Sequence, residues 1–270
     1  MTASAVARRG REPVAIVPGV WRVGGGSWRG AVTPLSAEAD CNVYFLDLDG
    51  AGVLVDCGTR AGLGAIAANL RRVGCGPDAV TDVLLSHSHW DHTDGVAAWQ
   101  ERPRPPAIHL NGVGATLLAR GDHRLAGYQL LAPPHRFEPF RVDHRVEDGE
   151  RFRLGTMTID AHFMPGHTPD STLFTFDLQD RAVGICGDVA FGPAGDHGVV
   201  LGQLCTLWQS NLDDYVRSLR RLVERRIDIL LPGHGDAVIG QERVHDALRA
   251  TLELARSLAA DTRVRANLGV

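Results

Sequence analysis

The sequence predicts an α/β fold in which polar side chains gather at the C-terminal ends of strands. Two observations support this class. Short apolar runs typical of strands are interspersed with segments whose apolar residues recur at helical spacing. Segments rich in Gly, His and Asp directly follow several apolar runs, where the site residues of α/β folds collect. With 270 residues, of which 44% are hydrophobic, the chain is long enough for one large domain.

The first part of the chain is predicted to consist mainly of strands. Residues 1–12 contain arginines but lack the apolar stretch of a signal peptide, so we expect a disordered tail before a domain at 13–265. Two antiparallel strand pairs are expected, one around Pro18-Gly19 and one around Asp49-Gly50. The predicted strands are 14–17, 20–23, 42–48 and 52–57. A helix is predicted at 63–73.

Strands and helices alternate in the remainder of the chain. Further strands are predicted at 83–85, 107–110, 182–186 and 227–231, with others around a turn within 152–178. Helices are predicted at 95–100, 211–225 and 244–258. Asn211 fits the N-cap position of the second of these helices. His109 falls inside a predicted strand and is interpreted as structural.

A histidine-rich segment follows the apolar run 83–85. It contains His87, His89, Asp91 and His92 in the spacing H-x-H-x-D-H. Imidazole nitrogens and a carboxylate are ligands that zinc, iron and manganese accept, and four of them within six residues can reach two metals. The competing interpretation is a polar surface turn. Three His and one Asp at this spacing seldom occur by chance, which disfavours that interpretation.

Three later segments offer the additional ligands that a dinuclear site needs. His167, Asp188 and His234 each lie just after a predicted strand and beside a Gly that lets the backbone turn sharply. Each segment taken alone is typical of an ordinary turn. Because all three occur at strand ends, together they predict one site with the histidine-rich segment.

This ordered set of residues closely resembles the metallo-β-lactamase-fold hydrolase superfamily, in particular its glyoxalase II and lactonase-like dinuclear members. Asp56 matches an upstream Asp that supports the metal loop in that family. The resemblance implies a single-domain αββα sandwich with the metals at one edge of two sheets. It implies a first metal bound by His87, His89 and His167, a second bound by Asp91, His92 and His234, and Asp188 as the bridge.

The resemblance also implies a mechanism. Two divalent ions, zinc first with iron or manganese as alternatives, would lower the pKa of a bridging water towards about 7. Asp91 would orient the resulting hydroxide and pass a proton to the leaving group, which makes Asp91 and Asp188 the predicted catalytic residues.

Departures from known relatives narrow the substrate. True metallo-β-lactamases lack the bridging Asp, so Asp188 argues against β-lactams. Phe191 stands where lactonases often have Tyr, and only a short segment follows His234, unlike glyoxalase II. We therefore expect hydrolysis of a small ester, thioester or lactone. The alternative is an iron-dependent persulfide dioxygenase-like enzyme that uses His87, His167 and Asp188. A non-catalytic binding protein is disfavoured by the complete ligand set.

Three irregular segments are candidates for substrate specificity. A connection at 112–146 is predicted to form a lid or pocket wall, with a solvated surface excursion as the alternative. A second candidate segment is 192–210. In the resembled family the loop between the first strands overhangs the metals. The individual candidates are Trp21, Trp28, Arg124, Tyr128, His135, Arg136, His197 and Trp208.

Composition excludes several classes of function. A net charge of −4 gives no electrostatic support for nucleic-acid binding, and no apolar window approaches the length of a membrane span. Every basic residue is Arg, which excludes lysine chemistry. Five cysteines without a C-x-x-C spacing favour the reducing cytoplasm. The expected partner is a small-molecule substrate, and the oligomeric state stays open.

Overall fold

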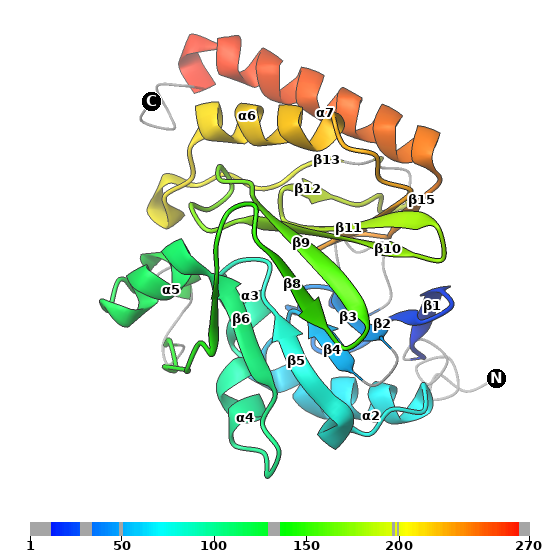
Figure 1. Cartoon of the computed structure of the whole chain (residues 1–270). Coiled ribbons are helices and arrows are strands. Elements are labelled where there is room, and N and C mark those ends of the chain that lie inside the picture. The colour runs from blue at the N-terminus through cyan, green and yellow to red at the C-terminus, as the bar shows by residue number, and fades with distance from the viewer. Residues whose placement is uncertain are drawn as a thin grey trace, which may run out of the picture.

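The computed structural model describes residues 12–27, 34–48, 51–128, 136–195, 198 and 200–264. The expected N-terminal tail up to residue 11 and the Asp49-Gly50 turn lie outside these residues. Two β-sheets pack face to face, with helices on both outer faces (Figure 1). The predicted αββα sandwich is therefore confirmed.

The first sheet has seven strands in sequence order. They are β1 (Val14–Val17), β2 (Val20–Gly24), β3 (Val43–Asp47), β4 (Gly52–Val55), β5 (Val80–Leu84), β6 (Ala107–Asn111) and β7 (His144–Val146). Strands β1 to β4 are antiparallel neighbours, whereas β4 to β7 run parallel. Because parallel strands end at the same edge, Asp56 after β4 and His87 after β5 come close together.

The second sheet has the strand order β15-β14-β11-β10-β9-β8. Its strands are β8 (Arg151–Leu154), β9 (Met157–Phe163), β10 (Thr172–Leu178), β11 (Arg181–Gly187), β14 (Ile229–Pro232) and β15 (Val238–Ile239). A small separate pair consists of β12 (Ala190–Phe191) and β13 (Val200–Leu201). Strands β11 and β14 are parallel, with Gly187 paired to Pro232. This register places Asp188 and His234 at the same edge of the sheet.

Helices cover the outer face of each sheet. The first sheet packs against α2 (Leu63–Arg72), α4 (Val96–Gln100) and α5 (Gly112–Ala119), and the second against α6 (Leu212–Val223) and α7 (Gln241–Ala260). Helix α3 (Trp90–Thr93) belongs to the histidine-rich segment. Single 3-10 turns occur at η1 (Arg60–Gly62), η2 (Pro77–Ala79), η3 (His123–Ala126) and η5 (Thr206–Trp208).

Most predicted elements are confirmed, but helix α5 was not predicted. Gly112 and Gly114 lower the helix propensity of its sequence, which concealed it within the connection expected to be irregular at 112–146. The structure explains Gly114, because a Cβ atom there would lie 2.3 Å from Asp170 Oδ2 and 2.9 Å from Ser88 Oγ. Because Gly114 has no Cβ atom, α5 approaches Ser88 of the histidine-rich segment more closely than any other residue at position 114 would permit.

His109 has the structural role expected of it. Its Nε2 lies 2.7 Å from Asp82 Oδ1, and its Nδ1 lies 3.0 Å from Nδ1 of His144 on β7. Nε2 of His144 in turn lies 2.8 Å from Glu150 Oε1. This chain of hydrogen bonds ties the edge strand β7 to β6 and to the residue before β8.

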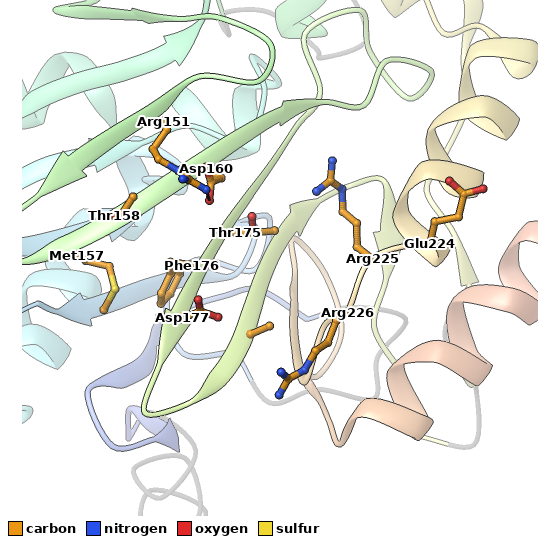
Figure 2. A pocket seen from close by; sticks show the side chains of 11 residues that line it. Arg151, Met157, Thr158, Asp160, Thr175, Phe176, Asp177, Glu224, Arg225 and Arg226 are labelled. Carbon is orange, nitrogen blue, oxygen red and sulfur yellow. Dashed lines mark hydrogen bonds and ion pairs between the residues drawn. The ribbon is translucent and has the colours of Figure 1, made fainter.

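A cavity of about 810 Å³ lies over β8–β11, beside the C-terminal end of α6 (Figure 2). Its lining includes Arg151, which pairs with Asp160 at 2.7 Å, and Arg226, which pairs with Asp228 at 3.0 Å. It contains none of the predicted metal ligands. Among the described residues, no helix combines the length and the apolarity needed to cross a bilayer.

Phe174 provides a test of the core between the sheets. It is fully buried in the cluster that joins them, so truncation leaves a cavity. We expect Phe174→Ala to lower the free energy of unfolding by about 3–5 kcal/mol, measured by urea denaturation. Leu254→Ala, on an exposed position of α7, is the control and should change stability by less than about 0.5 kcal/mol. Equal effects of the two changes would contradict this packing.

Candidate metal centre

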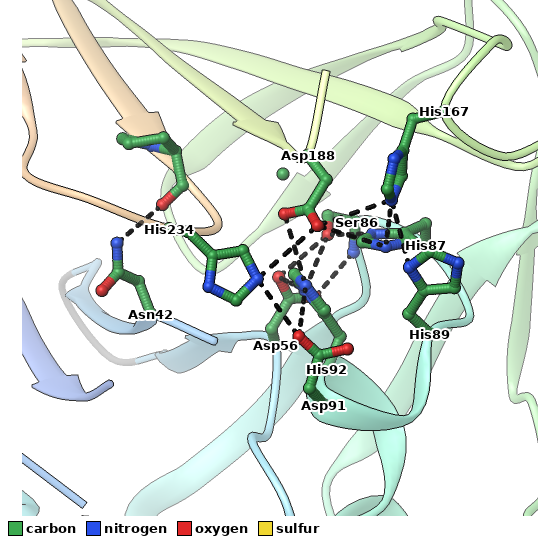
Figure 3. Close-up of polar contacts among 12 residues, drawn as sticks. Asn42, Asp56, Ser86, His87, His89, Asp91, His92, His167, Asp188 and His234 are labelled. Atoms are coloured by element: carbon green, nitrogen blue, oxygen red, sulfur yellow. Dashed lines mark hydrogen bonds and ion pairs between the residues drawn. The ribbon is translucent and has the colours of Figure 1, made fainter. Parts of the chain in front are cut away.

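Asp56 anchors the histidine-rich segment at the end of β5. Its carboxylate accepts hydrogen bonds from the backbone nitrogen of Ser86 at 2.8 Å and from Ser86 Oγ at 2.9 Å (Figure 3). Nδ1 of His92 lies 2.8 Å from the same carboxylate. The supporting role expected of Asp56 is therefore confirmed. Because His92 donates through Nδ1, its Nε2 is left to face the other site residues.

Three imidazole nitrogens converge at one point, two from the histidine-rich segment and one from His167. Nε2 of His167 lies 3.2 Å from Nε2 of His87 and 3.1 Å from Nδ1 of His89. His167 comes from the turn after β9, and its Nδ1–H donates to the carbonyl oxygen of Gln203 at 2.5 Å. That hydrogen bond fixes the tautomer, so Nε2 of His167 presents a lone pair to the other two histidines.

A second group of ligand atoms lies next to the first. Nε2 of His234 is 3.1 Å from Oδ2 of Asp91, and Nε2 of His92 is 3.6 Å from the same oxygen. The three side chains come from two parts of the chain, since Asp91 and His92 lie on α3 and His234 follows β14.

Asp188 lies between the two groups. Its Oδ2 is 3.4 Å from Nε2 of His167 and 3.9 Å from Nε2 of His87, while its Oδ1 is 3.4 Å from Nε2 of His92. One carboxylate therefore contacts both sets of imidazoles (Figure 3). The structure brings together all seven residues that the sequence singled out as metal ligands.

These distances fit metal ions. Zinc–ligand bonds of about 2.0–2.2 Å at tetrahedral angles place neighbouring ligand atoms about 3.4 Å apart. The separations around His167 and Asp188 lie close to this value. Nε2 of His92 and Oδ1 of Asp188 are also buried without a hydrogen-bond partner. Buried polar atoms are rarely left unsatisfied, so a cation that binds them accounts for both.

The protonation of the first group of histidines also suits metal binding, whereas nearby acidic groups outweigh burial and raise the pKa of His92 and His234. Burial lowers the pKa of His87, His89 and His167, so these imidazoles are neutral at pH 7. Burial alone would raise the pKa of Asp188, but the facing imidazoles of His234 and His92 bring it well below its usual value. Neutral imidazoles and an ionised carboxylate are the forms that coordinate divalent ions.

The loop that carries His234 is held by residues of the first sheet. The side-chain amide of Asn42 donates to the carbonyl oxygens of Pro232 at 3.0 Å and of Gly235 at 2.7 Å. The hydroxyl of Tyr44 donates to the Pro232 carbonyl at 2.8 Å. Sequence analysis missed these residues because a single Asn or Tyr at a strand carries no pattern that indicates a partner about 190 residues away.

The specificity candidates have different outcomes. Trp208 lies against His89, with ring centroids 4.4 Å apart, and lines the cavity at the site. Trp21 instead stacks on Phe45, so its role is in packing. Tyr128 and Arg136 line an adjacent cavity.

Arg124 is exposed and pairs with Asp122 rather than with the site. The remaining candidates lie outside the described residues; they are Trp28, His135 and His197.

Comparison with known proteins agrees with this geometry. The sequence profile of the metallo-beta-lactamase superfamily matches residues 37–234. The chain is 28% identical over 198 residues to an atrochrysone carboxyl ACP thioesterase of Aspergillus fumigatus, a match that covers 73% of this chain and 51% of that protein. It is 32% identical over 97 residues to a hydroxyacylglutathione hydrolase of Jannaschia sp., which covers 36% of this chain and 29% of that one.

This chain thus spans about half of the thioesterase and less of the hydroxyacylglutathione hydrolase. Among solved structures, a motif mutant of a metallo-beta-lactamase from Cronobacter sakazakii superposes with a TM-score of 0.71 at 22% identity. That match covers 94% of this chain and 99% of the other. At this identity the likeness concerns the fold alone.

Asn42→Asp tests the anchoring of His234. The change keeps the shape of the side chain but replaces its donor with a negative charge facing two carbonyl oxygens. We expect the zinc affinity of the Asp91, His92 and His234 group to fall about 10–100-fold, with the other group retained. Competition with a chromophoric chelator measures both affinities.

The matched control is Asn69→Asp. Asn69 is equally buried and donates to the carbonyl oxygens of Val23 and Leu35, away from the ligands. If both variants bind zinc alike, Asn42 does not position His234.

Proposed function

Because this chain belongs to the metallo-β-lactamase superfamily, we propose that it is a metal-dependent hydrolase of small esters, thioesters or lactones. The observation that carries the proposal is Asp188, whose carboxylate faces both groups of ligand atoms. Its Oδ2 lies 3.4 Å from Nε2 of His167 and 3.6 Å from Nε2 of His234, and its Oδ1 lies 3.4 Å from Nε2 of His92. A carboxylate in that position suits a centre with two metal ions.

The proposed ligands follow the two groups. His87, His89 and His167 would hold one ion, Asp91, His92 and His234 the other, and Asp188 both. When bound, two divalent ions would supply Lewis acidity that activates water at neutral pH. Zinc suits this set of imidazoles and carboxylates, and iron and manganese accept the same ligands.

The side chains around the centre would perform the remaining tasks. Asp91 is partly exposed at the cavity, so its carboxylate can orient a water molecule, accept its proton and deliver that proton to the leaving group. The hydrogen bond between His167 and Gln203 and those made by Asp56 keep the imidazoles oriented. Trp208 and Phe191 form apolar walls that exclude water.

The relatives support the class of substrate. Two of them are named for hydrolysis of thioesters, one of an acyl-carrier-protein thioester and one of hydroxyacylglutathione. Asp188 argues against β-lactams as substrates. The similarity to the β-lactamase structure concerns only the fold and does not favour them. A cytoplasmic location stays a prediction, supported by the free thiols of all five cysteines.

The persulfide dioxygenase-like alternative also has a geometric basis. Nε2 of His87, Nε2 of His167 and Oδ2 of Asp188 lie 3.2–3.9 Å from one another, so these three residues can hold a single iron. It would leave the second group of ligands without a role, and we therefore rank it below the dinuclear hydrolase.

Metal content separates the two functions. We expect inductively coupled plasma mass spectrometry of the freshly purified protein to find close to two zinc or manganese ions per chain. Removal of the metal by a chelator should abolish hydrolysis of thioesters and lactones, and zinc should restore it. About one iron per chain, with oxygen consumption on sulfur substrates, would instead support the dioxygenase.

Asp188→Asn tests the bridging role. The amide keeps the size of the side chain but loses the charge that faces both groups, so we expect about one metal per chain and at least a hundredfold lower kcat. Asp177→Asn, at an exposed position of the same sheet, is the matched control. Two bound metals and an unchanged rate in Asp188→Asn would show that Asp188 is not the bridge.

His87→Ala combined with His89→Ala tests the first group. The double variant removes two of its three nitrogens, so both bound metal and activity should be lost. Circular dichroism serves as the control for folding. Unchanged metal content in a folded double variant would place the metal elsewhere.

A further inference from the structure

Two cavities share Trp90 as a lining residue. The inner cavity, of about 190 Å³, is lined by five of the seven predicted metal ligands together with Phe191 and Trp208. The apolar lining of the outer cavity, of about 720 Å³, consists of Ala37, Ala39, Ala61, Tyr128 and Trp90. Trp90 is therefore a wall common to both.

Neighbouring residues of the chain line the two cavities. Asp91 lines the inner cavity and Asp94, one turn later, lines the outer one. Gly127 likewise lines the inner cavity, and the next residue, Tyr128, lines the outer one. A Cβ atom on Gly127 would lie 3.5 Å from Cδ1 of Trp90, which places Gly127 in contact with the indole ring.

The inner cavity is smaller than a typical binding site. Binding sites for small molecules commonly have volumes of about 300–1,000 Å³, above the value found here. It has room for the scissile group and the reacting water, whereas a longer substrate would extend beyond it. The outer cavity is the adjoining space.

The outer cavity suits an apolar group. Three alanines and two aromatic rings supply its apolar surface. Its polar groups are largely paired with one another, since Asp94 accepts hydrogen bonds from the Tyr128 hydroxyl at 2.5 Å and from the backbone nitrogen of Arg60 at 2.8 Å. The Arg60 side chain pairs with Glu138. Four of the lining charges are exposed, those of Glu38, Arg60, Arg136 and Glu138.

We propose that the outer cavity binds an apolar chain or ring of the substrate, attached to the ester or thioester bond cleaved in the inner cavity. The inference rests on the proposed hydrolase function and specifies its substrate as one with a hydrophobic portion on one side of the scissile bond. The substrate chain would pass Trp90, which lines both cavities.

Chain-length series test this assignment in the zinc-loaded protein. One arm compares p-nitrophenyl octanoate with p-nitrophenyl acetate, and the other compares octyl acetate with ethyl acetate. Because each buried methylene contributes about a fourfold gain, the longer member of one arm should have at least a tenfold higher kcat/KM. A gain in the first arm places the acyl group in the outer cavity, and a gain in the second places the alcohol there.

Ala61→Trp fills the outer cavity from an exposed position and should lower that ratio at least tenfold. Ala260→Trp, at the end of α7 and far from both cavities, should leave the ratio unchanged. Binding of octanoate and of 1-octanol, measured by calorimetry, provides a readout that needs no catalysis; one of the two should bind wild type and lose affinity in Ala61→Trp.

The outcomes separate the two proposals. If octanoate or octanol binding depends on Ala61 but no ester is hydrolysed, the cavity assignment holds and the hydrolase function fails. If acetate esters are hydrolysed while neither the length ratio nor the binding responds to Ala61→Trp, the hydrolase stands and the cavity assignment is overturned. The cavity assignment is also overturned if chain length has no effect on rate or binding in the wild type.

Discussion

The convergence of five imidazoles and two carboxylates, five of these seven side chains buried, is the constraint on which the rest of this structure depends. Hydrogen bonds do not satisfy all of these groups, since Nε2 of His92 and Oδ1 of Asp188 are buried without a hydrogen-bond partner and face each other at 3.4 Å. Removing such groups from water costs free energy, which their mutual attraction offsets in part and a bound cation would offset further. Hydrogen bonds on the other side of each ring keep the Nε2 atoms facing the site. Asp56 orients the imidazole of His92, and the carbonyl oxygen of Gln203 orients that of His167.

Each sheet contributes half of this arrangement. The parallel strands β4 and β5 of the first sheet carry Asp56 and the histidine-rich segment, while β11 and β14 of the second carry Asp188 and His234. The core between the sheets sets their distance, and Asn42 links the edges directly by binding the loop after β14. With His167 after β9, the fold brings two strand ends of one sheet against three of the other.

Sequence alone was enough for the fold class and for which residues meet, because ligand chemistry and strand periodicity leave visible patterns. The histidine-rich segment, His167, Asp188 and His234 each follow an apolar strand, and the structure brings them together. Helix α5 was not predicted because Gly114 lowers the helix propensity of its sequence. The glycine is required there by the close approach to Asp170, a tertiary contact that the sequence does not reveal. The hydrogen bonds from Asn42 to the loop after β14 and the cavity beside Trp90 likewise arise only from the packing of distant segments.

The contacts between Asn42 and the loop after β14 join residues separated by about 190 positions, so they bear on how the chain folds. Contacts between such distant positions raise the contact order of the fold, which slows folding. The histidine-rich segment follows a strand of the first sheet, whereas His167, Asp188 and His234 follow strands of the second. Each group of ligands therefore draws side chains from both sheets, and neither group is complete until the two sheets have docked.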